Sequence, residues 1–245
     1  MKRSELAEWV GLHYLHAMKI RNLLNTSVTL LSWIILVSGQ DINLSENLEL
    51  QLQQQGLVNI QKYSPHILVE LKYSTSDNFL GVDTYGDLEN CYLQPKAAIM
   101  LGQAQALLKR DHPDLTLLVY DGARPRSVQR KMWALVAGTP TQDYVANPKR
   151  GSVHNFGSAV DLTIANNDGI PLDMGTAFDY FGKLAQPRHE QQFLKEGKLS
   201  SQQIENRKLL RDVMLQAGFQ SISIEWWHFN AVPVKIARSE YRIIE

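Results

Sequence analysis

Cysteine is nearly absent from this 245-residue sequence, which contains a single one, Cys91. One cysteine permits no intrachain disulfide and excludes a cysteine-rich zinc site. A metal site in this chain must therefore use His, Asp or Glu, which are common ligands of catalytic zinc. Because Cys91 has no cysteine partner in the chain, we interpret it as a small buried apolar residue.

An excess of charge of either sign is also lacking. Lys and Arg together number 25, as do Asp and Glu, so the formal net charge is zero. Binding to a phosphate backbone requires a basic surface, so this balance argues against a nucleic-acid partner, and no motif indicates a protein partner. The 44% of hydrophobic and 20% of charged residues are ordinary for a globular domain, and the length suffices for one sizeable core.

The apolar run near the N-terminus is too short to span a bilayer. VTLLSWIILV, residues 28–37, has ten residues where a span needs about 20. Lys19 and Arg21 precede it and small residues follow it up to Gly39, which is typical of a secretory signal peptide. We therefore predict an N-terminal extension with a signal peptide over 1–39, a domain over 40–245, and a periplasmic mature protein without a membrane span. The alternatives are an uncleaved anchor, a buried or membrane-surface helix, and a cytoplasmic protein.

The apolar pattern after residue 56 predicts helices and strands in irregular alternation. Alternating residues predict two strands, 57–63 and 66–73, joined by a turn at Ser64 and Pro65. Further strands are predicted over 116–122, 158–165 and 221–229, and residues 74–93 indicate a loop. Helices are predicted over 95–110, 127–136 and 201–217, the last with a capping box of Ser200 and Gln203. This order favours a single α+β domain with a mainly antiparallel central sheet flanked by helices.

Two histidines and two acidic residues interrupt the predicted strands. In SVHNFGSAVDLTI (152–164), His154 precedes Asp161 by seven positions, and in IEWWHF (224–229), Glu225 precedes His228 by three. Each residue alone is more typical of a core histidine, a salt bridge or a solvated glutamate. Together, a His/Asp/His set would leave the fourth position of a tetrahedral zinc ion open for water, which is the catalytic arrangement. A carboxylate that is not a ligand, such as Glu225, can then carry a proton.

The spacing of these residues constrains the backbone. Residues three apart on a regular strand point to opposite faces, so a bulge or strand end must lie between Glu225 and His228. Gly157 can form the turn that brings His154 back over the strand that carries Asp161.

Taken together, SVHNFGSAVDLT and EWWHF resemble the zinc D-Ala-D-Ala dipeptidases of the vancomycin-resistance type. The wider group of zinc peptidases to which they belong also includes D,D-carboxypeptidases. The resemblance extends over most of residues 57–235. It includes LKYSTSDNF (71–79), the CYL at Cys91, YDGARPRS (120–127) and MGTAFDYF (174–181).

The resemblance implies one zinc ion per chain, with His154, Asp161 and His228 as its ligands. It implies that Glu225 acts as general base and acid for a zinc-activated water, and that Arg124 stabilises the oxyanion. A guanidinium suits the latter role because it cannot lose its charge. Ser152 and Asp179 match positions that hold the substrate, with Asp179 near the ammonium group of a small D-dipeptide.

Three functions remain open at this point. The first is hydrolysis of D-alanyl-D-alanine or close D-dipeptides to free amino acids. The alternative is a zinc D,D-carboxypeptidase that trims longer peptidoglycan stem peptides and therefore needs an open groove in place of a closed end at Asp179. The third is a zinc-binding domain without catalysis, which the presence of both Glu225 and Arg124 disfavours.

Overall fold

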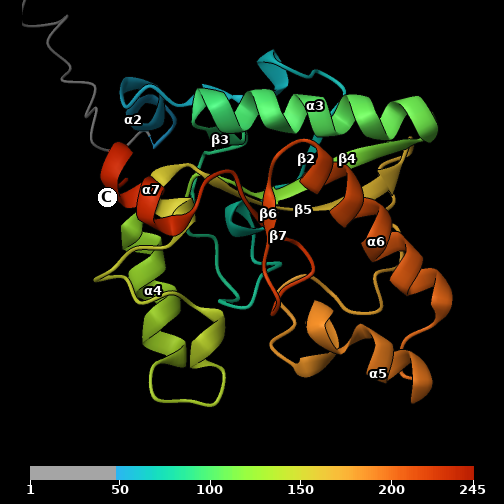
Figure 1. The fold of residues 1–245 in the computed structure, drawn as a ribbon. Helices are drawn as coiled ribbons and strands as arrows, with labels where there is room; N and C mark the ends of the chain where they lie inside the picture. The colour runs from blue at the N-terminus through green and yellow to red at the C-terminus, as the bar shows by residue number, and fades with distance from the viewer. Residues whose placement is uncertain (1–47) are drawn as a thin grey trace, which may run out of the picture. The chain divides into compact units, whose positions relative to one another are not determined.

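A five-stranded sheet forms the centre of the domain in the computed structural model, which describes residues 48–245 (Figure 1). The strand order is β2 (Leu68–Val69), β4 (Leu115–Asp121), β5 (Ala159–Asn166), β7 (His228–Asn230) and β6 (Gln220–Ser221). β2 runs parallel to β4, whereas every other neighbouring pair in this sheet is antiparallel. A separate antiparallel pair joins β1 (Val58–Asn59) to β3 (Tyr92–Leu93). The sheet is therefore mixed and mostly antiparallel, and the predicted α+β class is confirmed.

Helices surround this sheet. The α-helices of the described residues are α2 (Leu48–Gln54), α3 (Pro95–Asp111), α4 (Arg126–Val136), α5 (Glu190–Lys195), α6 (Ser201–Gln216) and α7 (Val234–Glu240). Short 3-10 helices are η1 (Ile60–Lys62), η2 (Lys72–Ser74), η3 (Gln142–Tyr144), η4 (Val153–Phe156), η5 (Lys183–Ala185) and η6 (Pro187–His189). In Figure 1, α3 lies along one side of the sheet with α6 beside it, while α4 and α5 lie toward the other side.

The central strand β5 separates the hydrophobic core from the polar site. Val160, Leu162 and Ile164 are buried in the main apolar cluster, together with residues of α3 and α6. Because successive side chains of a strand point to opposite faces, Asp161 and the other odd-numbered residues face away from α3 and α6. The core thus packs against one face of β5, and this packing fixes the strand whose opposite face presents Asp161.

The helix signals of the sequence are confirmed. Pro95 occupies the first turn of α3, where its missing N–H costs no hydrogen bond. The predicted capping box of α6 is present, because the Ser200 hydroxyl accepts from the Gln203 N–H and the Gln203 side chain accepts from the Ser200 N–H.

The two predicted strands over 57–63 and 66–73 are wrong in extent and in pairing. Only two residues of each segment are strand: β1 pairs with β3, and β2 runs parallel to β4, so no hairpin forms at Ser64 and Pro65. A 3-10 turn follows each of the two short strands, η1 after β1 and η2 after β2, and these turns bury Ile60 and Tyr73. The apolar alternation of the sequence is not an alternation of burial, because Leu57 and Ile60 are buried three positions apart. The turn between them satisfies its backbone locally, since the Asn59 side chain accepts from the Gln61 N–H.

The predicted signal peptide and extension over 1–39 lie outside the described residues. Within residues 48–245, no helix is both long enough and apolar enough to cross a membrane.

Candidate active site

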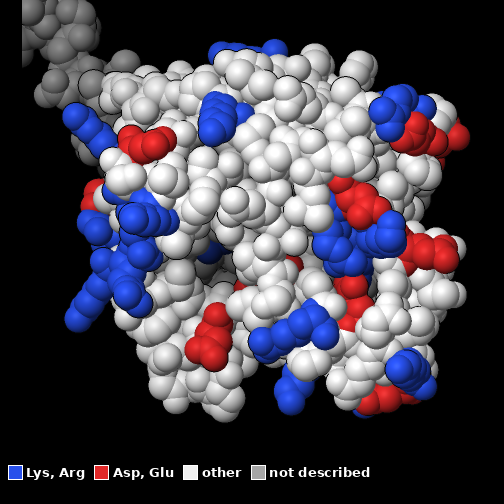
Figure 2. Space-filling model, in the orientation of Figure 1, with Lys and Arg blue, Asp and Glu red and all other residues white. Residues whose placement is uncertain are grey.

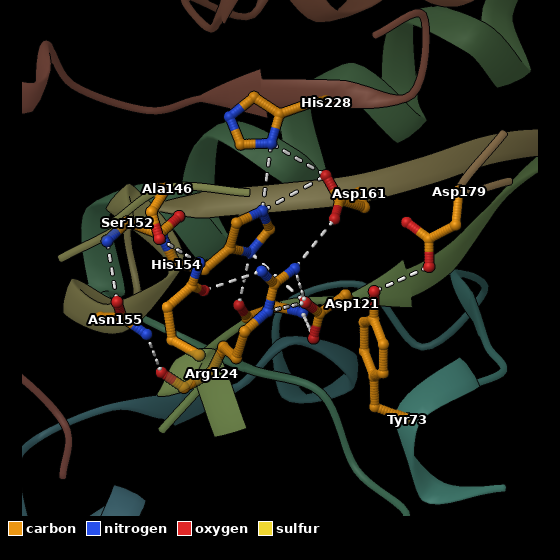
Figure 3. Close-up of polar contacts among 12 residues, drawn as sticks. Tyr73, Asp121, Arg124, Ala146, Ser152, His154, Asn155, Asp161, Asp179 and His228 are labelled. Carbon is orange, nitrogen blue, oxygen red and sulfur yellow. Dashed lines mark hydrogen bonds and ion pairs between the residues drawn. The ribbon is translucent and has the colours of Figure 1, made fainter. Parts of the chain in front are cut away.

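Three predicted metal ligands converge on one point beside the sheet (Figure 3). His154 Nε2 lies 3.1 Å from His228 Nδ1 and 3.3 Å from Asp161 Oδ1. His228 Nδ1 lies 2.9 Å from Asp161 Oδ1, which closes a triangle of nearly equal sides. All three residues are buried.

Strand register and one glycine bring these side chains together. Asp161 on β5 pairs directly with His228 on β7, so the two side chains project from the same face. His154 lies in η4, and Gly157 ends that helix with φ of 62°, in the left-handed region that favours glycine. The predicted turn at Gly157 is therefore confirmed, and it leads directly into β5.

The hydrogen bonds on the outer nitrogens of both histidines fix their tautomers. His154 Nδ1 lies 2.8 Å from the carbonyl oxygen of Gly122, and His228 Nε2 lies 2.9 Å from Asn230 Oδ1. Since each oxygen accepts, each outer nitrogen carries the proton, and the inner nitrogens present lone pairs to the triangle.

This donor set fits a zinc ion. With the outer nitrogens protonated, two imidazole lone pairs and one carboxylate oxygen face one another, an arrangement that a cation stabilises. Zinc at about 2.0–2.1 Å from tetrahedral ligands sets their separations near 3.3 Å, close to the 2.9–3.3 Å sides of the triangle.

Glu225 lies in the irregular segment between β6 and β7. The strand predicted over 221–229 is wrong as a continuous element, because residues 222–227 are not strand. The interruption does supply the strand end that the spacing of Glu225 and His228 requires. Within the described residues nothing hydrogen-bonds to the Glu225 carboxyl, which lines the same cavity as the ligands, and burial raises its pKa to about 8.

Arg124 follows β4 and points toward Asp161. Its Nε and Nη2 donate to Asp121 Oδ2 at 2.8 and 2.5 Å, and Nη2 also lies 3.4 Å from Asp161 Oδ2. Nη1 donates to Gln129 Oε1 at 3.0 Å. These bonds use four of the five guanidinium N–H groups, so one N–H on Nη1 has no acceptor within residues 48–245. A rigidly held cation with a spare donor suits stabilisation of an oxyanion.

Asp121 was missed at the sequence level although it organises the site. Its Oδ1 accepts from the Tyr85 hydroxyl at 2.6 Å and from the Gly122 N–H at 2.8 Å, while Oδ2 holds Arg124. A register shift between Val119 and Asp121 leaves Tyr120 as an extra residue and turns Asp121 to the face of Asp161. The signal was available, since Asp121 ends a buried apolar run as Asp161 interrupts one.

Asp179 lies on the opposite side of the triangle from Ser152 (Figure 3). The Tyr73 hydroxyl donates to Asp179 Oδ2 at 2.7 Å, and the Tyr73 ring lies under the Arg124 guanidinium, 5.3 Å from its centroid. Asp179 has φ of 59°, the one non-glycine residue of the described chain in this region of conformational space. Such a backbone persists where the surroundings determine it, which is common at binding sites. Burial raises the pKa of this carboxyl to about 7.

The segment that carries Asp179, residues 174–184, is anchored by buried side chains. Arg207 donates to the carbonyl oxygens of Met174 and Leu184, near the two ends of the segment. Trp226 Nε1 donates to Thr176 Oγ1 at 2.9 Å. Trp226 thus supports this segment, while its neighbour Trp227 lines the cavity.

Ser152 caps η4, where its hydroxyl accepts from the His154 N–H at 3.4 Å. It also lines the cavity that contains the triangle and Asp179. Its predicted contact with substrate stays a prediction.

The cavity over the triangle measures about 260 Å³, slightly below the roughly 300–1,000 Å³ of sites for drug-sized ligands. Three aromatic residues from separate loops meet on its wall, and we call them the aromatic clasp: Phe79, Tyr144 and Phe181. The Phe181 ring lies 4.8 Å from that of Phe79 and stacks on that of Tyr144 at 5.1 Å. The clasp was not anticipated, because ring contacts between distant loops leave no local pattern.

Comparison with known proteins agrees with this geometry. A family model described as D-Ala-D-Ala dipeptidase matches residues 53–242. The D-alanyl-D-alanine dipeptidase of Escherichia coli (strain K12) is 33% identical over 174 residues, covering 71% of this chain and 83% of that protein. Dipeptidases of the same name from Enterococcus faecalis (strain ATCC 700802 / V583) and Enterococcus faecium are 29% and 31% identical, covering 66% and 65% of this chain and 85% and 83% of those proteins. Since the family model matches most of the chain, the resemblance is confirmed and the chain belongs to the D-Ala-D-Ala dipeptidase family of peptidases.

Proposed function

We propose that this enzyme hydrolyses D-alanyl-D-alanine, or a close D-dipeptide, with one zinc ion held by His154, Asp161 and His228. The observation that carries the proposal is the convergence of three possible ligand atoms on a small cavity that is also lined by the Glu225 carboxyl and the Arg124 guanidinium. When bound, a zinc ion with three protein ligands acidifies water and polarises a carbonyl group.

The roles of the flanking residues follow from their surroundings. Glu225 takes a proton from the attacking water on its carboxylate and passes it to the nitrogen of the leaving amino acid as the C–N bond breaks. Its raised pKa suits both halves of this transfer near neutral pH. Arg124 stabilises the charge that develops on the carbonyl oxygen with its spare N–H, because Asp121 and Gln129 fix its orientation.

The amine end of the cavity favours a dipeptidase over a carboxypeptidase. Asp179 supplies a carboxylate for a free ammonium group, and Phe79 and Phe181 join across the wall beside it. A stem peptide would need to extend its chain through this end. The acidic wall with its aromatic contact therefore supports a substrate with a free amino group.

We also propose that residues 1–39 act as a signal peptide and that the mature enzyme is periplasmic, where it would act on dipeptide released from the cell wall. The support is the basic flank, apolar run and small residues of the sequence. The mass of the mature N-terminus tests this proposal, and a secreted chain that still begins at residue 1 or 18 would contradict cleavage.

Alanine release tests the activity, with zinc-loaded enzyme on free D-Ala-D-Ala and on an N-acylated peptide ending in D-Ala-D-Ala. We expect cleavage of the free dipeptide alone. Cleavage of both would favour the carboxypeptidase, and cleavage of neither would reject the proposal.

Glu225→Gln tests the proton-transfer role, with the zinc content of the variant measured alongside. We expect loss of turnover with zinc still bound, whereas the control Glu205→Gln, at an exposed position on α6, should behave as wild type. Wild-type turnover by the zinc-loaded Glu225→Gln variant would refute the role.

A further inference from the structure

The cavity carries opposite charges at its two ends. Figure 3 places Ser152 on one side of the triangle and Asp179 on the other. Asp179 is the lining carboxylate on its side, where the aromatic clasp closes the wall. On the Ser152 side, Arg238 is the lining residue that bears a positive charge.

Arg238 is held in place by backbone carbonyl groups. Its Nε donates to the carbonyl oxygen of Arg150 at 3.0 Å, and its Nη2 donates to that of Gly151 at 3.3 Å. Gly151 directly precedes Ser152, so the guanidinium is tied to the segment that leads into η4. α7, which carries Arg238, packs on that same segment through the apolar cluster of Val153, Phe156 and Ala237.

The charge of Arg238 is not neutralised within the described residues. No carboxylate of residues 48–245 lies within ion-pair distance of it, whereas Arg124 is paired with Asp121. The two carbonyl groups use two of the five N–H donors, which leaves three for another acceptor. Figure 2 shows further Lys and Arg side chains gathered over α4 and α7, beside a hollow in the surface. This end of the cavity therefore favours an anion.

We propose that Arg238 binds the terminal carboxylate of the substrate. The inference rests on the proposed function, which sets the ammonium at Asp179 and the reacting carbonyl at the triangle. The other end of a zwitterionic dipeptide then points toward Ser152 and Arg238. A guanidinium matches a carboxylate in charge and in the spacing of its donors. Arg238 thereby selects for a free C-terminus, as Asp179 selects for a free N-terminus.

The test compares D-Ala-D-Ala with its C-terminal amide, which keeps the ammonium and the scissile bond but lacks the negative charge. Arg238→Ala should raise the KM for the dipeptide about tenfold, the low end expected for an exposed charge-assisted hydrogen bond, with kcat little changed. The KM for the amide should stay at the wild-type value. Arg238→Lys, which keeps the charge but not the fork of donors, should fall between wild type and Arg238→Ala.

Arg242→Ala is the matched control, because Arg242 is exposed near the same end of the chain, does not line the cavity, and its loss changes the net charge equally. An equal loss in this variant would assign the effect to the general field and overturn the inference. So would equal changes for dipeptide and amide in Arg238→Ala.

Calorimetric binding of both compounds to the metal-free protein separates this inference from the proposed function. A preference for the acid over the amide that Arg238→Ala abolishes would support the inference even if the zinc-loaded enzyme hydrolysed neither compound. A preference that survives in Arg238→Ala, or no preference in the wild type, would overturn it.

Discussion

Asp121→Asn isolates the interaction that orients Arg124. The asparagine oxygen can still accept from Tyr85 and Gly122, so the change removes mainly the two guanidinium bonds to Oδ2. Charge-assisted bonds contribute about 1.5–3 kcal/mol each, and removing one partner of a buried ion pair costs about 3–5 kcal/mol. Since Asp121 is fully buried, we expect a loss of about 4 kcal/mol from the free energy of unfolding.

Urea unfolding of the metal-free protein, followed by tryptophan fluorescence, measures this loss. With an m-value of roughly 2–3 kcal/mol/M, about 4 kcal/mol lowers the midpoint by about 1.3–2 M. Asp212→Asn is the matched control, because Asp212 pairs with Lys208 at 2.5 Å, the same distance as Asp121 to Arg124, but both partners are exposed. That pair should contribute less than about 1 kcal/mol.

The reasoning would be refuted if Asp121→Asn lost no more stability than Asp212→Asn. A second arm adds Arg124→Met to Asp121→Asn, which removes the guanidinium left without its carboxylate. The double variant should recover part of the loss, because the uncompensated buried charge is gone.

Three further perturbations test other parts of the site. Gly157→Ala should lower the free energy of unfolding by about 1–3 kcal/mol more than Gly197→Ala does. Both glycines have positive φ, but only at Gly157 would a Cβ clash with a neighbour. Equal losses in urea unfolding would contradict this. Because burial raises the pKa of Asp179 to about 7, the affinity of the metal-free protein for the dipeptide should rise between pH 6 and pH 7.5, before the substrate amine loses its proton near pH 8. Stability should move oppositely, since the native state holds this proton between about pH 4 and 7 and the unfolded state does not; Asp179→Asn should flatten both profiles. Arg207→Met should lower the thermal midpoint and raise the KM for the dipeptide by releasing the segment that carries Asp179, whereas neighbouring exposed Lys208→Met should do neither.

The sequence predicted those parts of the fold that depend on local signals. α3, α4 and α6 begin and end within a residue of the expected positions, because proline and capping residues act on adjacent backbone groups. β4 and β5 were predicted because they are buried on both faces and contain long apolar runs. β1 and β2 were overestimated, since a strand of two residues is defined by its partner and not by its own pattern.

The same contrast between local signals and long-range contacts applies to the residues of the site. The convergence of His154, Asp161 and His228 was predicted because these residues interrupt strand-like segments and match a family motif, while their role as metal ligands stays a prediction. Asp121, Tyr73 and Arg238 were not assigned, since their positions depend on a bulge, a loop contact and a helix that docks from a distant part of the chain. Long-range contacts of this kind leave no periodic trace in the sequence.

The triangle also has a consequence for folding. His154 and His228 are separated by 74 positions, and β7, which carries the second, has three residues. The three donors meet only after β5 and β7 have paired, so an unfolded chain offers no comparable site. A metal bound there selects the native state by mass action and slows local opening of the C-terminal strands. If the site holds zinc as proposed, zinc supply would govern how long the protein survives proteolysis as well as how fast it turns over.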